Sequence, residues 1–402
     1  MPQKVLLLAP VLPADVQATA NILENAELLE SLVTRGVTTR RIERLLPRST
    51  ITRSFSRRPA SPVAKELTDA KWISDLVFYV TLAFTQSRTR AIDGSFAFLD
   101  RLASQRINPD VGAVLAREDC CLQTFRCAKQ AGVTTIYQLP TAYWRTVHEM
   151  MVREFAEFPN ICKAANDPNE FAEERTIRKD AELSSADQVL CPSTFARASL
   201  TRHRAGTYEM IPFAINGNTA LSAERSRKPM FLYAGNITMR KGVHRLLLAW
   251  KELKAHRTHE LRLVGDMFLS EKFLRDFRGM FTHVPRLARD ELDRYYREAA
   301  GFVFNPVADG FGHVILEAMR CGTPVIASKN CGAPDTITNR VEGLLVDYGD
   351  QSQLISALDL ALSNPAELRE MGRAAADRAK KYTWEDYGER FLNWLRPLLK
   401  HG

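Results

Sequence analysis

Short apolar runs alternate with longer helical segments along this chain of 402 residues, and several of the runs end at a glycine. The clearest run is Met230-Phe231-Leu232-Tyr233-Ala234-Gly235, which is typical of a buried strand that enters a tight turn. The residues after it predict helices over 243–253, 290–299 and 312–320, and strands over 261–264, 301–304 and 325–328. This alternation predicts an α/β fold with parallel sheets of the Rossmann type.

The first half of the chain shows the same alternation less regularly. Strands are predicted at 5–8, 110–115, 133–137 and 188–191, and helices over 18–32 and 146–158. Ser193 is a plausible N-cap for another helix. A polar segment over 222–228 separates the halves. We therefore expect two Rossmann-like domains, over 1–215 and 216–382, and a final helix within 383–402 that braces the first domain or simply packs on a core.

The composition excludes several classes of protein. With 45% hydrophobic and 25% charged residues, the chain is neither disordered nor a coiled coil. No uncharged apolar run approaches the ~20 residues that span a bilayer, and the apolar run at 5–8 is too short for a signal-peptide core. The seven cysteines are scattered, with no CxxC pair, which favours a reducing cytoplasm.

The net charge of +8 is concentrated in one stretch between residues 35 and 58. Its basic residues are Arg35, Arg40, Arg41, Arg44, Arg48, Arg53, Arg57 and Arg58. One interpretation is a solvated surface. The other is a patch that meets an anion such as a lipid headgroup or a phosphorylated acceptor, which would place a cytoplasmic protein against the inner face of a membrane. Nucleic acid is excluded as a partner, because Phe55 is the stretch's sole aromatic residue.

The segment 309–324, DGFGHVILEAMRCGTP, carries the strongest chemical signal. It follows a predicted strand and opens a helix, whose first N–H groups and dipole suit a diphosphate. Gly310 and Gly312 allow the backbone to approach a ligand closely. Asp309 and Glu317 flank the turn and can accept hydrogen bonds from sugar hydroxyls. A turn with two solvent-facing carboxylates is the alternative, and Gly322 is expected to cap the helix.

A second segment, Gly235-Asn236-Ile237-Thr238-Met239-Arg240-Lys241-Gly242, follows the first predicted strand of the same half. Open α/β sheets bind ligands at the carboxyl ends of their strands. Arg240 and Lys241 lie at such an end and could neutralise a departing diphosphate. The alternative is a basic turn on an exposed helix N-terminus, which the helix dipole disfavours.

Together these segments resemble the retaining glycosyltransferases of family four, which have the GT-B fold. That family carries a Glu-x7-Glu motif, and Asp309 and Glu317 have the same spacing here, with GFG, EAM and CGTPV intact. The resemblance covers 231–346 and continues towards the carboxyl end. It implies that the two Rossmann-like domains face each other across a cleft, with the acceptor on the first and a nucleotide sugar on the second.

The resemblance also implies roles for individual residues. Asp309 would bind a hydroxyl of the donor sugar, while Lys241 and Arg240 would stabilise the diphosphate, and these three form the expected catalytic set. Glu317 would bind the ribose, and the segment 283–286 would hold the base. The expected donor-binding residues are Gly235, Asn236, Val284, Arg286, Gly310, Phe311, Gly312, His313, Val314 and Glu317.

The chain departs from the family pattern at four places. The first carboxylate is Asp309 rather than Glu, and Asn236 replaces the usual Arg, for which Arg240 would compensate. The glycine-rich loop after the first strand is missing at 10–15. Arg117-Glu118-Asp119 stands where a His-Asp pair is expected. These four departures leave the donor half of the resemblance supported, and they bear on the acceptor and on the standard geometry of the family.

The acceptor side offers weaker candidates. Tyr143, Arg145 and His148 follow a predicted strand end, where an aromatic ring could stack on a sugar and a cation could meet a polar acceptor. A helix start packed on the core is the alternative. Glu118 and Asp119 could position an acceptor hydroxyl, or be ordinary loop carboxylates.

The sequence thus predicts a glycosyltransferase that moves a sugar from a UDP- or GDP-sugar to a saccharide or lipid-linked acceptor with retention of configuration. Without an Asp-x-Asp motif no metal is required, and no other cofactor is expected. The main alternative is a GT-B-like protein that binds a sugar nucleotide or glycan without transferring it. A phosphorylase or epimerase of the same fold ranks last.

Overall fold

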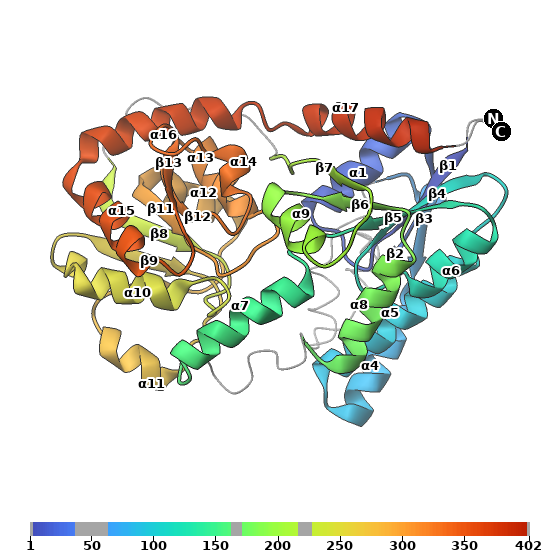
Figure 1. Cartoon of the computed structure of the whole chain (residues 1–402), viewed down its shortest axis with the longest axis horizontal. Coiled ribbons are helices and arrows are strands. Elements are labelled where there is room, and N and C mark those ends of the chain that lie inside the picture. Colours follow the sequence, from blue (N-terminus) through green and yellow to red (C-terminus); the bar gives the residue numbers. More distant parts are fainter. Residues whose placement is uncertain (1–2, 37–62, 162–170, 216–226, 400–402) are drawn as a thin grey trace, which may run out of the picture.

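The computed structural model describes residues 3–36, 63–161, 171–215 and 227–399, which form two α/β domains side by side (Figure 1). Every strand pair described in either domain is parallel. Of the arginine-rich stretch, Arg35 belongs to the described residues and the others lie outside them, as does Asn216 at the predicted domain boundary. The predicted α/β class of fold, with two Rossmann-like domains, is confirmed.

The amino-terminal sheet has seven strands in the order β3-β2-β1-β4-β5-β6-β7. They are β1 (Lys4–Leu8), β2 (Leu29–Arg35), β3 (Thr68–Lys71), β4 (Val111–Arg117), β5 (Thr134–Gln138), β6 (Gln188–Cys191) and β7 (Tyr208–Met210). The helices are α1 (Ala14–Asn25), η1 (Lys65–Leu67), α4 (Trp72–Thr85), α5 (Arg88–Ser104), α6 (Leu122–Gln130), α7 (Trp144–Glu157), α8 (Glu173–Ser184) and α9 (Thr194–Thr201). The strand order reverses between β1 and β4, which is where open α/β sheets bind ligands.

The carboxyl-terminal sheet repeats this order with six strands, β10-β9-β8-β11-β12-β13. They are β8 (Lys228–Ala234), β9 (Glu260–Val264), β10 (Thr282–Val284), β11 (Ala299–Phe304), β12 (Val325–Ser328) and β13 (Gly343–Val346). The helices are α10 (Val243–Glu252), η2 (Ala255–Arg257), α11 (Glu271–Leu274), η3 (Arg275–Phe277), α12 (Arg289–Glu298), α13 (His313–Arg320), α14 (Ala333–Thr336), α15 (Gln351–Ser363), α16 (Pro365–Ala379), α17 (Trp384–Leu395) and η4 (Arg396–Leu398).

One predicted element is wrong. The helix expected over 18–32 ends at Asn25, and Leu29 already belongs to β2. The Leu28 N–H donates to the Leu23 carbonyl (2.9 Å), and the Glu27 N–H donates to Glu24 (2.9 Å). This is a Schellman ending, with Glu27 rather than glycine in the left-handed conformation (φ 58°). Because no glycine marks this ending, the sequence gives no stop signal.

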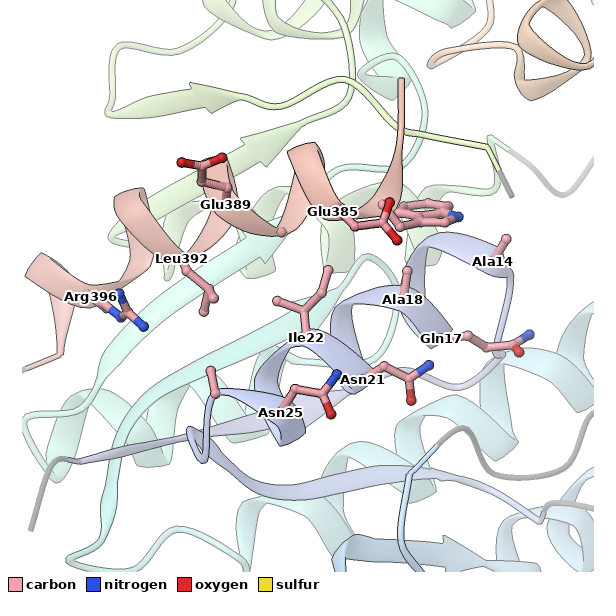
Figure 2. A pocket seen from close by; sticks show the side chains of 13 residues that line it. Ala14, Gln17, Ala18, Asn21, Ile22, Asn25, Glu385, Glu389, Leu392 and Arg396 are labelled. Carbon is pink, nitrogen blue, oxygen red and sulfur yellow. The ribbon is translucent and has the colours of Figure 1, made fainter. Parts of the chain in front are cut away.

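Helix α17 returns to the amino-terminal domain and lies along α1 (Figure 1). Tyr387 from α17 and Thr19 from α1 share a buried hydrogen bond of 3.2 Å between their hydroxyl oxygens. Gly388 lets the helices approach, since a Cβ there would lie 3.1 Å from the Ile22 side chain. Beside this contact the two helices leave a groove of about 760 Å³, which Gln17, Asn21, Ile22, Glu385, Leu392 and Arg396 help to line (Figure 2).

Helix α7 belongs to the amino-terminal domain but reaches the carboxyl-terminal one, where Glu154 is 1% exposed. Its carboxylate accepts two hydrogen bonds from Arg245 (2.7 and 3.1 Å), contacts His244 Nε2 (2.5 Å) and accepts a third from the Tyr348 hydroxyl. Burial alone would raise the pKa of Glu154, but these partners lower it to about 2. The carboxylate is therefore ionised and joins the two domains.

Glu154→Gln should destabilise the protein by about 3 kcal/mol near neutral pH, because it leaves the buried Arg245 with the exposed carboxylate of Glu157 (2.6 Å) in place of a buried counter-charge. Since the folded-state pKa is depressed, the carboxylate stabilises the fold above about pH 4.5, and this stabilisation is lost as the pH falls towards 2. Urea unfolding at several pH values measures both effects. Glu157→Gln is the control, because the Glu157 side chain is 55% exposed; equal losses in the two variants would contradict the prediction.

No helix in the described parts of the chain combines the length and the apolar character needed to cross a bilayer.

Candidate functional site

The predicted catalytic cations lie in the turn between β8 and α10. The Lys241 N–H donates to the Thr238 hydroxyl (3.2 Å), and the Arg240 carbonyl accepts from the Val307 N–H (2.9 Å). Gly242 closes the turn in the left-handed conformation (φ 72°), and a Cβ there would lie 1.9 Å from the Asn305 carbonyl. The turn is therefore fixed against the segment that follows β11.

Asp309 lies in that segment, and its carboxylate accepts a hydrogen bond from Lys241 Nζ. Burial alone would raise the pKa of Asp309, but Lys241, Arg240 and the Phe311 N–H outweigh burial and hold it below its usual value. The Lys241 ammonium also lies 5.5 Å from the centre of the Phe304 ring. The fold thus brings the three predicted catalytic residues together at the edge of the sheet, since Lys241 pairs with Asp309 and Arg240 donates to the neighbouring Ala308 carbonyl (3.5 Å).

The loop between Asp309 and α13 contacts the amino-terminal domain. A Cβ on Gly310 would lie 2.1 Å from the Pro140 carbonyl oxygen, so only glycine fits there. The Gly310 carbonyl accepts a hydrogen bond from the Ser193 hydroxyl. Gly312 is the N-cap of α13, with a φ of 83° that favours glycine. The N-terminus of α13 therefore faces the boundary between the domains.

Aromatic rings pack against one another at the same boundary between the domains. The Phe213 ring stacks on His313 with centroids 4.9 Å apart, and it meets Phe311 edge to face at 5.5 Å. Burial lowers the pKa of His313, although Asp15 from the amino-terminal domain and Glu317 oppose this shift. His313 is therefore neutral near pH 7.

Glu317 lies inside α13 and is 8% exposed. Its carboxylate accepts hydrogen bonds from Arg289 (2.6 Å) and from the Tyr296 hydroxyl (3.1 Å). Both partners belong to α12, and no sequence motif indicates either of them. A carboxylate has about four lone-pair directions, so Glu317 can still accept from a ligand.

The other predicted donor residues lie at the carboxyl edge of the same sheet. Val284 ends β10, and its carbonyl accepts from the Gly265 N–H (2.9 Å). Arg286 is exposed in the next turn, and Asn236 is exposed after β8. The Asn236 carbonyl accepts from the Tyr233 hydroxyl (2.8 Å), which fixes the turn at Gly235. Val314 is half-buried in the first turn of α13.

The amino-terminal domain contributes a polar group whose members were not among the candidate site residues. Asp15 lies in the first turn of α1, Arg117 ends β4 and Gln138 ends β5. Arg117 donates to Asp15 (2.6 Å), and the Gln138 amide lies 3.4 Å from the same oxygen. These residues flank the reversal point of the sheet. Asp15 is the first charged residue after the first strand, and this is the signal that could have identified it.

Glu118 and Asp119 lie beside this group, but both form ion pairs with basic residues of α8. Lys179 Nζ is 3.1 Å from Glu118, and Arg178 donates to Asp119 (3.1 Å). Burial raises the pKa of Glu118. Asp119 adopts a left-handed φ of 81°, and its N–H donates to Glu182 (2.9 Å). A role in binding an acceptor stays a prediction for both residues.

Tyr143 and Arg145 contact each other and share Asp180 as a partner. The Tyr143 hydroxyl donates to Asp180 (2.7 Å), and Arg145 pairs with the same carboxylate. Burial raises the pKa of Tyr143 to about 12. His148 packs against Phe171, with ring centroids 4.9 Å apart. These contacts fit the packed start of a helix, and the acceptor role of the three residues stays a prediction.

Residues 219–378 match the family model of glycosyl transferases group 1. The D-inositol 3-phosphate glycosyltransferase of Segniliparus rotundus is 34% identical over 275 residues, which are 61% of this chain and 60% of that protein. The enzyme of the same name from Pseudarthrobacter chlorophenolicus is 28% identical over 233 residues, 52% of this chain and 56% of that protein. The chain thus matches little more than half the length of these relatives.

Two solved structures resemble the whole chain. Sucrose-phosphate synthase of Thermosynechococcus elongatus superimposes with a TM-score of 0.66 at 20% identity and covers 98% of this chain and 99% of its own. The Anabaena protein HepE, solved with UDP-glucose, has a TM-score of 0.60 at 13% identity and covers 98% and 99%. The chain therefore has the GT-B fold, and the match to the group 1 glycosyl transferase model lies within its carboxyl-terminal half.

Gly310→Ala should weaken the contact between the domains, because the new Cβ would overlap the Pro140 carbonyl. Overpacking of this kind costs about 1–3 kcal/mol. We expect a larger radius of gyration by small-angle scattering, with little change in secondary structure. Gly94→Ala is the control, since its Cβ would meet Thr81 at an ordinary 3.6 Å; an unchanged radius in Gly310→Ala would contradict the assigned contact.

Proposed function

We propose that this protein transfers a glycosyl group from a nucleotide-diphospho-sugar to a saccharide or lipid-linked acceptor, with retention of configuration. The contact between Lys241 and Asp309, beside the N-terminus of α13, is the observation that carries the proposal. The contact places a cation beside a carboxylate that can accept hydrogen bonds from sugar hydroxyls, at the boundary between the domains. The relation of residues 219–378 to group 1 glycosyl transferases supports the proposal.

Lys241 is assigned to the departing diphosphate. An ammonium has three hydrogens, so the bond to Asp309 leaves two for phosphate oxygens. Arg240 adds a second positive charge from the same turn. The first N–H groups of α13 have no partner within the helix and meet the diphosphate with a positive dipole end. These groups are fixed before the reaction, and they stabilise the negative charge that builds as the glycosidic bond breaks.

Asp309 is assigned to the donor sugar. Its lowered pKa keeps it ionised and therefore able to accept hydrogen bonds from sugar hydroxyls. The transition state is expected to resemble an oxocarbenium ion, which a nearby carboxylate favours. Contact between the domains at Gly310 would exclude water, which otherwise hydrolyses the donor. Retention of configuration is inferred from the motif that Asp309 and Glu317 form, because it resembles the Glu-x7-Glu motif of the retaining glycosyltransferases of family four.

The nucleotide is assigned to Glu317 and the end of β10. Glu317 would accept hydrogen bonds from the ribose, with Arg289 and Tyr296 holding the carboxylate in place. Val284 and Arg286 would contact the base. The UDP-glucose in the HepE structure favours a uridine donor over a guanosine one. No metal takes part in this proposal, since the cations and the helix terminus supply the positive charge.

Lys241→Ala and Glu317→Ala should each lower the rate of transfer roughly tenfold or more, the scale of a lost charge-stabilising contact. Release of free nucleotide in the presence of acceptor measures the rate. Lys251→Ala, on the same domain but on the body of α10, controls for the loss of a positive charge. Unchanged rates in both site variants would exclude the assigned donor site.

A nucleotide sugar that binds the folded protein should raise its melting temperature. The stabilisation reaches about 2.7 kcal/mol at a ligand concentration about a hundred times Kd. We expect UDP-sugars to produce a shift that Glu317→Ala abolishes. A panel that includes GDP-sugars identifies the base, and the absence of any shift across the panel would contradict donor binding.

A second candidate function is binding of a sugar nucleotide or glycan without transfer. The engagement of Glu118 and Asp119 by α8 favours it, because no His-Asp pair stands at that strand end. A thermal shift without nucleotide release, over a broad set of acceptors, would support binding alone.

A further inference from the structure

Helix α4 is almost wholly apolar, with the sequence WISDLVFYVTLAFT. Its one charged residue, Asp75, is 1% exposed and accepts hydrogen bonds from Arg35 (2.6 and 2.9 Å). A helix that is apolar on all sides is normally surrounded by protein or lipid. This helix lies instead at the periphery of the amino-terminal domain (Figure 1).

Large apolar side chains form an exposed stripe along α4. Ile73 is 51% exposed, Leu76 60%, Val80 46% and Phe84 86%. Their spacing of three, four and four residues sets them on one face of the helix. We call these four residues the α4 stripe. Exposed apolar residues scattered singly are ordinary, but a contiguous stripe marks an interaction surface.

The opposite face of α4 is firmly held, so the stripe is a fixed surface. Helix α5 packs along it in an antiparallel hairpin, where Gly94 lies opposite Thr81 and Val77. The Arg35 guanidinium lies 5.1 Å from the centre of the Phe78 ring. The Ser87 hydroxyl caps α5 at the tip of the hairpin.

Positive charge lies beside the apolar stripe. Arg88 and Arg90 are exposed in the first turn of α5, directly after Phe84 and the end of α4. Between residues 72 and 90 the sequence has no acidic residue except the buried Asp75. The exposed tip of the hairpin therefore combines apolar and cationic side chains, the combination that suits an anionic lipid surface.

We propose that the α4 stripe docks on an anionic lipid bilayer, with Arg88 and Arg90 against the headgroups. At 14 residues, α4 is roughly 21 Å long, too short to cross the hydrocarbon core, so it lies in the interface. The overall charge of +8 favours an anionic surface over a second copy of the same sign. The arginines at 40–58 lie outside the described residues, and the surface is defined without them.

The docking is independent of the transfer reaction, but its consequence for the acceptor rests on the proposed function. Lys71 ends β3 and Trp72 begins α4, so the hairpin starts at the carboxyl edge of the amino-terminal sheet. Asp15 and Arg117 lie at the same edge. A membrane bound by the hairpin would therefore lie on the side of the domain from which a lipid-linked acceptor arrives.

Sedimentation of the full chain with lipid vesicles tests the proposal. Phosphatidylcholine vesicles that contain phosphatidylglycerol should bind the protein, and pure phosphatidylcholine vesicles should bind it less. Phe84→Ser and Leu76→Ser should each lower the partition coefficient roughly tenfold, the cost of removing a large apolar side chain from the interface. The double variant Arg88→Ala, Arg90→Ala should reduce the preference for the anionic vesicles.

Matched variants at other exposed positions are the controls. Val341→Ser removes a side chain that is 48% exposed on the other domain, and Arg369→Ala removes an exposed charge on α16. Both should bind vesicles like the unmodified protein. The melting temperatures of all variants verify that each is folded. The thermal shift with UDP-glucose reports separately on the donor site.

Three outcomes would overturn the proposal. One is that the unmodified protein binds neither vesicle. Another is that the stripe variants bind as tightly as the controls. The last is a dimer in sedimentation velocity that Phe84→Ser dissociates, which would show that a second copy covers the stripe.

Discussion

The hydroxyl of Ser193 joins the two halves of the candidate site. Its oxygen accepts a hydrogen bond from the Ala196 N–H (3.0 Å) as the N-cap of α9, and its proton is donated to the Gly310 carbonyl. The next residue, Thr194, donates its N–H to Asp335 (2.9 Å) from the start of α14. The amino-terminal end of one short helix therefore fixes two loops of the other domain, including the loop that positions Asp309.

Two buried charged contacts have different consequences for function. At Glu154 the carboxylate is saturated by partners from the other domain, so it stabilises one arrangement of the domains and has little capacity left for a ligand. At Asp309 the ion-pair partner is Lys241, which keeps two of its hydrogens for other acceptors. Charge with unused hydrogen-bonding capacity is what a phosphate site requires.

Much of the donor half could be predicted from its sequence. Strand, glycine turn and helix follow one another locally there, so β8, α10, β12 and α13 lie within a few residues of their expected bounds. The partners of Glu317 could not be predicted, because Arg289 is 28 positions away and carries no motif. In the other half, Tyr143 and Arg145 meet Asp180 through tertiary packing, and sequence spacing carries no information about such a contact.

The geometry also limits how the domains can separate to admit a substrate. The chain passes between them near Ile215 and again near Tyr382, and a backbone hydrogen bond of 3.0 Å joins these two crossings. The two crossings are therefore joined at one place on the boundary between the domains. Glu154 is held by α10 and Tyr348 elsewhere on the interface, and the Gly310 contact lies at the site itself. A rotation of the domains about these joined crossings that opens the site must break the Gly310 contact. A rotation that also lifts α7 must expose the buried carboxylate of Glu154. Because Glu154 loses its partners at high cost, motions that leave α7 docked are favoured over full separation of the domains.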